Sequence, residues 1–378
     1  FFTTVHPVMS PQYVMTSWIS KKVAGFWLYC QIFAAFAQAY MGVAFGTYLT
    51  SIFTGISTSA AACIIVTLFF LLNLLDLNIA TSILLIVLLS FIILGLGKCD
   101  MNQLFSKESL LFGGTRGIFD ACAAVLFGVG GCTIIMNFGP QIENPKRNIP
   151  KMTIITFICA FLAFGLVAFV GSGVAPLAEV AGKPMTYQAQ IIYPGNWYLL
   201  FVIGGALLAI VTTINANYQR YWSSILRGVD EGWLPEFMGK RNKHGIPWVL
   251  MVLFWLMALI PNLFGLNIGQ LISLASAVTL IPMLIPVWGF VKLPECDPEG
   301  WNASKMSKTF ASKGSRIALC AVSTILLGIF VVLNVLKFSK VAVIFVCVYF
   351  AVCAAICVFF GDKLLAAGEK RLAVKGEQ

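Results

Sequence analysis

Residues 127–150 read FGVGGCTIIMNFGPQIENPKRNIP, an apolar run with three close glycines that ends in a basic segment bracketed by prolines. Each glycine lowers helix propensity by about 1 kcal/mol relative to alanine, so the glycines predict an interrupted helix. Inside a membrane, non-helical backbone is tolerated only where protein or a watery cavity supplies hydrogen-bond partners. The segment therefore predicts either a binding site built from main-chain groups or a close contact between helices on small residues.

The composition of the whole chain places it in a membrane. Of 378 residues, 59% are hydrophobic and 11% are charged, whereas soluble domains carry about 25% charged residues. Apolar runs near the ~20 residues needed to cross a bilayer recur along the chain and predict an all-α polytopic bundle. Pro282 and Pro286 predict a kink in one of them. Ten transmembrane helices are expected, at 23–53, 57–75, 78–97, 117–139, 151–174, 196–226, 246–264, 266–292, 316–336 and 339–361.

The net charge of +10 reflects topology, because the basic residues lie between the spans. Alternating the loops puts nineteen of the 25 Lys and Arg residues on one side, which the positive-inside rule assigns to the cytoplasm. This side holds segments 140–151, 227–246 and 293–315 and the C-terminus, so we predict no nucleic-acid partner. On the other side, 101–113 and 175–195 are expected to form either lids or ordinary connectors.

Residue types for covalent chemistry and metal binding are sparse. Most of the eleven cysteines lie inside apolar runs, and the only histidines are His6 and His244. The sequence has no CxxC spacing, no phosphate-binding loop and no set of residues that resembles a hydrolase triad. We therefore predict no metal, no cofactor and no enzymatic activity.

Three segments resemble the amino acid–polyamine–organocation superfamily of permeases. The glycine-rich run followed by ENPKRNIP (143–150) is similar to the sixth helix and following turn of that family. Residues 215–247, NANYQRYWSSILRGVDEGWLPEFMGKRNKHGIP, resemble its eighth helix and loop. A third similarity covers 7–27, with a proline, a tyrosine and a Gly-Phe-Trp sequence.

The resemblance implies a leucine-transporter-type bundle of two inverted five-helix repeats, in which broken helices face each other across the substrate. The ten spans correspond to family helices three to twelve, so the first helix and most of the second are expected to be absent. The implied divisions are 1–97 for the rest of the first repeat, 117–292 for the second repeat with its broken helix 117–139, 316–361 for two accessory helices, and 362–378 for a cytoplasmic tail.

The resemblance also implies a substrate site around the broken helix. Phe127 matches an aromatic gate, although a bare phenylalanine is equally a core residue. The main-chain groups expected to contact substrate belong to Gly128, Val129, Gly130, Gly131, Cys132 and Thr133.

Other candidate residues lie on neighbouring spans. Gln38 and Tyr40 are polar groups in a pocket-lining helix, and each could instead make an interhelical hydrogen bond. Asn215 lies on the family's eighth helix, where Thr212 and Thr213 are weak candidates for a sodium site.

These features together predict a secondary active transporter of an amino acid or related amine, working by alternating access in the cell membrane. It could be a permease, symporter or exchanger, with a proton or sodium as a possible coupling ion and membrane lipid around it. The C-terminus is expected in the cytoplasm. The alternative is a membrane sensor or assembly subunit that keeps the permease fold without transporting.

Overall fold

A computed structural model describes residues 10–74, 82–106, 111, 113–129, 135–136, 142–265, 268–336 and 338–376. Over these residues the chain is all-α, and the only extended pairing there is an isolated bridge between Arg241 and Pro247. This confirms the all-α prediction. Helices satisfy their own main-chain groups, which is what long apolar segments require in lipid.

Six helical segments among the described residues are long and apolar enough to cross a membrane, and three shorter apolar helices accompany them. The six are Lys21–Thr50, Arg147–Gly173, Gly195–Tyr218, Val278–Cys296, Lys313–Val335 and Ala342–Arg371. The shorter three are Thr58–Leu74, Leu84–Leu96 and Trp248–Leu263. The protein is therefore a multi-pass membrane protein.

The helices of the N-terminal half follow the expected order of spans. They are α2 (Pro11–Ile19), α3 (Lys21–Ala34), α4 (Ala37–Thr50), α5 (Thr58–Leu74), α6 (Ser82–Leu96), α7 (Met101–Leu104), α9 (Gly114–Val129), α10 (Pro145–Gly173), α11 (Leu177–Val180) and α12 (Thr186–Ile192).

The C-terminal half mixes α-helix with short 3₁₀ and π segments. Its elements are η2 (Gly195–Trp197), α13 (Tyr198–Leu200), η3 (Phe201–Leu207), α14 (Leu208–Asp230), η4 (Glu236–Gly239), α15 (Trp248–Leu263), α16 (Ile268–Met283), η5 (Pro286–Lys292), α17 (Leu293–Cys296), α18 (Pro298–Ala303), α19 (Met306–Thr309), α20 (Lys313–Val335), α21 (Lys340–Ala355), η6 (Ile356–Phe360) and α22 (Gly361–Gly376).

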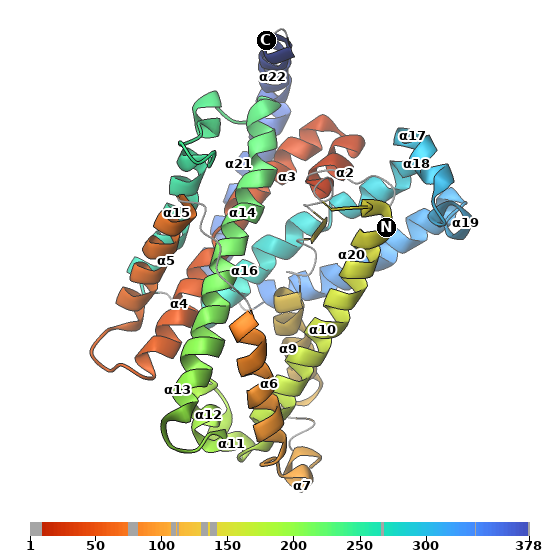
Figure 1. Ribbon diagram of the computed structural model, residues 1–378. Coiled ribbons are helices and arrows are strands. Elements are labelled where there is room, and N and C mark those ends of the chain that lie inside the picture. The colour runs from red at the N-terminus through yellow and green to blue at the C-terminus, as the bar shows by residue number, and fades with distance from the viewer. Residues whose placement is uncertain are drawn as a thin grey trace.

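The long helices run between two ends of the molecule (Figure 1). Helices α7, α11 and α12 lie at one end, and α17, α18 and α22 lie at the other. The second end contains segments expected to face the cytoplasm, including 293–315 and the C-terminal residues, and we call it the basic end. The residues assigned to the C-terminal tail form helix α22 there, which the sequence analysis does not predict.

The main core lies between α2, α3, α5, α14 and α15 near the basic end. Its largest buried side chains include Trp27 on α3, Tyr218 on α14, Trp233 just after α14, and Phe254 on α15. These aromatic groups fix α14 against α3, and this contact positions the polar groups described below.

A short 3₁₀ turn divides the span expected at 23–53 into two helices within the helical segment Lys21–Thr50. Helix α3 ends at Ala34 and α4 begins at Ala37, and the turn between them uses tighter bonds. The amide of Ala35 donates to Ile32, and that of Gln38 donates to Ala35, at 3.1 and 3.0 Å. Such i to i+3 bonds mark a short 3₁₀ segment. No proline or glycine lies at this turn.

Helix α10 begins at Pro145, before the start of the span expected at 151–174. Asn144 precedes it with φ 48°, and the amide of Asn148 donates to the Asn144 carbonyl at 3.0 Å. Proline at the first helical position loses no hydrogen bond, because that amide has no partner in a helix. Pro150 lies within the helix and forgoes one main-chain bond.

The span expected at 266–292 is interrupted between Pro282 and Pro286, and the kink itself stays a prediction. Helix α16 ends at Met283, and a 3₁₀ segment, η5, follows from Pro286. Two π segments, η3 and η6, were not expected, and they lie within the spans predicted at 196–226 and 339–361.

Candidate functional site

Gln38 forms the main polar contact between the first span and α14. Its side chain is fully buried, and its Nε2 donates to the Ile214 carbonyl on α14 at 3.2 Å. Its Oε1 has no hydrogen-bond partner among the described residues. The interhelical hydrogen bond left open by the sequence is therefore present, and the acceptor of the same amide is unsatisfied among the described residues. A buried acceptor without a partner is costly, so it needs an explanation.

Gln38 meets α14 directly after the 3₁₀ turn of the first span. The residue lies in the first turn of α4, immediately after the 3₁₀ segment. It is also near the middle of the candidate span Lys21–Thr50. The contact is therefore well inside the span, far from either loop.

Asn215 and Tyr218 continue this polar line along α14. Asn215 is next to Ile214 and is 9% exposed, and Tyr218 is fully buried one helical turn further on. The Tyr218 hydroxyl has no hydrogen-bond partner within the described part of the chain. Residues three apart share one helix face, so the Asn215-x-x-Tyr218 spacing indicates a pair of polar groups on one face of α14. We refer to Gln38, Asn215 and Tyr218 as the polar strip.

Replacing Tyr218 by phenylalanine is expected to raise the free energy of unfolding by about 1 kcal/mol, because it removes a buried hydroxyl that has no partner. Chemical denaturation of the ligand-free protein measures this change. If the hydroxyl meets a ligand, the same variant will show a smaller ligand-induced rise in melting temperature. A lower stability of the ligand-free variant would contradict the assignment of an unsatisfied hydroxyl.

Tyr40 lies apart from the polar strip. It packs on the cluster formed by Ala39, Val43, Ala62 and Leu271, between α4, α5 and α16. Residues two apart on a helix do not face the same way, so Tyr40 and Gln38 serve different neighbours. Its role in binding stays a prediction.

Helix α9 carries the start of the expected main-chain site. Its helical backbone includes Phe127, Gly128 and Val129. Gly130, Gly131, Cys132 and Thr133 lie outside the described residues. The interruption of this helix, and the aromatic gate at Phe127, therefore stay predictions.

The two weak sodium candidates are bonded within their own helix. The hydroxyls of Thr212 and Thr213 both donate to the Ala209 carbonyl, at 3.0 and 2.8 Å. Thr213 is also exposed on the surface of α14. A sodium ion at these hydroxyls stays a prediction.

An apolar groove of about 590 Å³ lies beside the polar strip but does not include it. Its walls come from α4, α6, α10 and the segment η3–α14, with Tyr48, Leu88, Val167 and Gly205 among the lining residues. The groove is suited to apolar chains rather than to a charged solute.

The connector 175–195 contains a small set of contacts around the Tyr187 ring. The Tyr187 hydroxyl donates to Glu179 at 3.2 Å, and Lys183 Nζ lies 3.9 Å from the centre of the Tyr187 ring. The hydrogen bond to Glu179 raises the pKa of Tyr187. These contacts stabilise the connector, and whether it acts as a lid stays a prediction.

Several helices long and apolar enough to cross a membrane, with the buried amide of Gln38 near the middle of one of them, define a polytopic membrane protein with polar groups between its helices. The amino acid permease family model matches residues 6–353, and the chain belongs to this family. Members of the family are transporters of amino acids and polyamines and not enzymes.

Individual relatives are similar over part of their length. A probable agmatine/putrescine antiporter of Lactococcus lactis is 26% identical over 204 residues, which cover 49% of this chain and 42% of the relative. A branched-chain amino acid permease of Bacillus subtilis is 24% identical over 57% of this chain and 46% of its own. A cadaverine/lysine antiporter of Escherichia coli is 25% identical over 38% and 35%. The chain thus spans less than half the length of these relatives.

Proposed function

We propose that the protein is a secondary active transporter that moves an amino acid or a related amine by alternating access. The observation that carries this proposal is the polar strip, where α4 meets α14. Within the described residues the Gln38 amide oxygen, near the middle of its span, and the Tyr218 hydroxyl, at the end of the span Gly195–Tyr218, have no hydrogen-bond partner. A solute with amino and carboxyl groups offers donors and acceptors for both. Family membership supports the same substrate class.

The proposed arrangement has ten spans in two inverted repeats, with the basic end in the cytoplasm. The order and bounds of the described helices support it, as does the gathering of the basic segments at one end. The interrupted helix after α9 would supply main-chain groups opposite the polar strip. A proton or a sodium ion would couple transport to a gradient.

Counterflow in proteoliposomes tests the proposal. The full-length protein is reconstituted in vesicles preloaded with one unlabelled solute from a panel of amino acids, polyamines and their precursors, and uptake of the labelled solute is followed. We expect transient accumulation for at least one solute, and replacing sodium or collapsing the proton gradient then identifies the coupling ion.

Two results would contradict the proposal. Binding of a solute, seen as a rise in melting temperature, without counterflow would indicate the sensor or assembly subunit instead. An absence of both binding and counterflow across the panel would remove amino acids and amines as substrates.

A further inference from the structure

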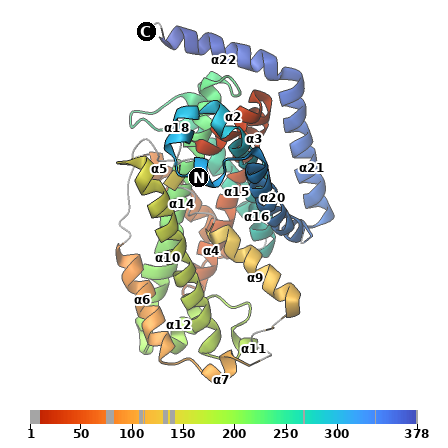
Figure 2. The same cartoon turned by 90° about the vertical axis from the view of Figure 1, so that its right-hand side faces the viewer.

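Helix α22 crosses the basic end of the molecule instead of leaving it. Figure 2 shows α22 lying crosswise to α21, over the ends of α2 and α3. The π segment η6 and Gly361 join the two helices. A Cβ on Gly361 would lie 3.3 Å from Lys22 Cγ, so the chain passes from α21 directly onto the start of α3. Single π turns inside α-helices are common at functional sites.

Two ion pairs connect α22 to the start of α3. Lys22 Nζ lies 2.8 Å from Asp362, and Lys21 Nζ lies 3.2 Å from Glu369. Exposed pairs of this kind contribute little stability each. They nevertheless fix which face of α22 meets α3.

The closest contact of α22 is with the turn that follows α14. Arg371 Nη1 donates to the carbonyls of Val229 and Leu234, at 3.3 and 3.2 Å, on either side of that turn. Gly232 in the turn has φ 90°. A Cβ on Gly368 of α22 would lie 2.1 Å from the Glu231 carbonyl oxygen. The two backbones therefore touch, and no side chain fits between them.

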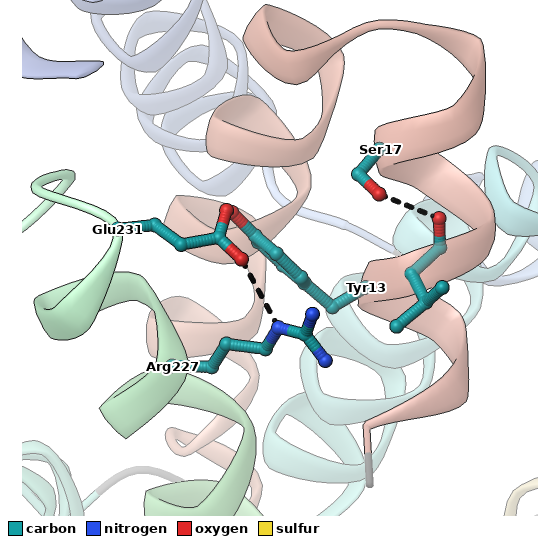
Figure 3. Close-up of polar contacts among 5 residues, drawn as sticks. Tyr13, Ser17, Arg227 and Glu231 are labelled. Atoms are coloured by element: carbon teal, nitrogen blue, oxygen red, sulfur yellow. Dashed lines mark hydrogen bonds and ion pairs between the residues drawn. The ribbon is translucent and has the colours of Figure 1, made fainter. Parts of the chain in front are cut away.

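The same turn carries a carboxylate that binds α2. The Tyr13 hydroxyl on α2 donates to Glu231 Oε2 at 2.5 Å, and Arg227 Nε on α14 lies 3.0 Å from Glu231 Oε1 (Figure 3). The Arg227 guanidinium also lies 5.5 Å from the centre of the Tyr13 ring. Because Glu231 is the residue whose carbonyl meets Gly368, the hold of α22 on the turn also positions the link between α14 and α2.

Two cavities border both the turn and α22. One cavity of about 430 Å³ is lined by Trp18, Glu231 and Leu365 among others. A second of about 610 Å³ is lined by Asp230, Lys240 and Arg371 among others. Helix α22 is therefore held by contacts on the turn and on α3, and its Leu364 and Leu365 also pack against the edge of the main core.

We propose that α22 is a strap that keeps the basic end closed. It contacts the turn after α14 through Gly368 and Arg371 and positions Glu231 to accept the hydrogen bond from Tyr13. These contacts keep α2, α3 and α14 together. When the strap lifts, the turn loosens, the Tyr13–Glu231 bond breaks, and the basic end opens toward the polar strip. The consequence for transport rests on the proposed function, whereas the grip on the turn does not.

Amide hydrogen exchange of the full-length protein in lipid nanodiscs tests the grip. We expect residues 228–234 to exchange about tenfold faster in Gly368→Ala than in the parent, because the added methyl group cannot fit against the turn. Gly328→Ala in α20 is the matched control, since a Cβ there meets no atom within 4 Å, and it should leave these amides unchanged.

Arg371→Gln is the second variant, because it removes the two main-chain hydrogen bonds without adding atoms at the contact. Faster exchange confined to the turn in this variant supports the strap. If Gly368→Ala also accelerates exchange throughout α15, that variant has loosened the whole fold, and the test of the strap then rests on Arg371→Gln alone. In that case, unchanged exchange at 228–234 in Arg371→Gln would overturn the strap. Unchanged exchange at 228–234 in both variants would overturn it as well.

A transport measurement separates the strap from the proposed function. If the parent shows counterflow, lifting the strap should strengthen apparent substrate affinity at the basic end and weaken it at the other end, measured in vesicles of opposite orientation. Equal affinities in parent and strap variants would overturn the gating role. A parent without counterflow would overturn the transport proposal, while the exchange experiment still decides whether α22 grips the turn.

Discussion

Replacing Gln38 by leucine is expected to lower the initial rate of counterflow about tenfold, which is the effect of losing one hydrogen bond to a charged substrate group. Its stability should be unchanged or higher. The amide is fully buried and its Oε1 is unpartnered, so an apolar side chain of similar size removes an unfavourable burial. Function and stability should thus move in different directions in a single variant.

The matched control is Asn334→Leu on α20. Asn334 is also a buried amide, 3% exposed, but its Nδ2 donates to the Phe330 carbonyl of its own helix at 2.9 Å. We expect this change to leave counterflow unaltered. Counterflow measured with denaturation profiles of both variants distinguishes the outcomes, and a Gln38→Leu protein that transports normally would remove the polar strip from the substrate site.

Replacing Trp233 by alanine is expected to lower the free energy of unfolding by about 3–5 kcal/mol, the usual cost of deleting a buried tryptophan side chain. The ring is 1% exposed, and a Cβ on Gly25 would lie 2.5 Å from it. The Trp233 carbonyl also accepts a bond from the Tyr29 hydroxyl at 2.7 Å. The residue therefore fills the joint between α3 and the turn after α14.

Trp197→Ala provides the comparison, because Trp197 is 64% exposed near the other end of the molecule. Equilibrium unfolding in detergent micelles should show a large loss for Trp233→Ala and a small one for Trp197→Ala. Similar losses for both would mean that the packing around Trp233 is not as tight as these contacts indicate.

Hydropathy located the helices well, because the requirement for apolar side chains in lipid acts on each segment separately. The span expected at 57–75 corresponds to α5, Thr58–Leu74, and the one at 316–336 to α20, Lys313–Val335. Helix α10 begins before the expected span 151–174 because hydropathy does not include its polar first turn, where Pro145 occupies the favoured first helical position.

The site was less predictable, since it depends on how separate helices meet. The sequence identified Gln38 and Asn215 as polar groups at depth, but only the packing of α4 on α14 shows that Gln38 bonds beside Asn215. Tyr218 was missed because a tyrosine in an amphipathic helix resembles an ordinary core residue. The strap could not be foreseen either, because a polar C-terminal segment gives no local sign of what it will contact.

The hydrogen bond between Gln38 and α14 has a consequence for how the protein is made. Gln38 lies in an early span, whereas its partner, the Ile214 carbonyl, lies on a helix that is synthesised much later. During synthesis the bond can form only after α14 is in the membrane. The polar contact of an early span thus waits for a later one, so it forms late in assembly.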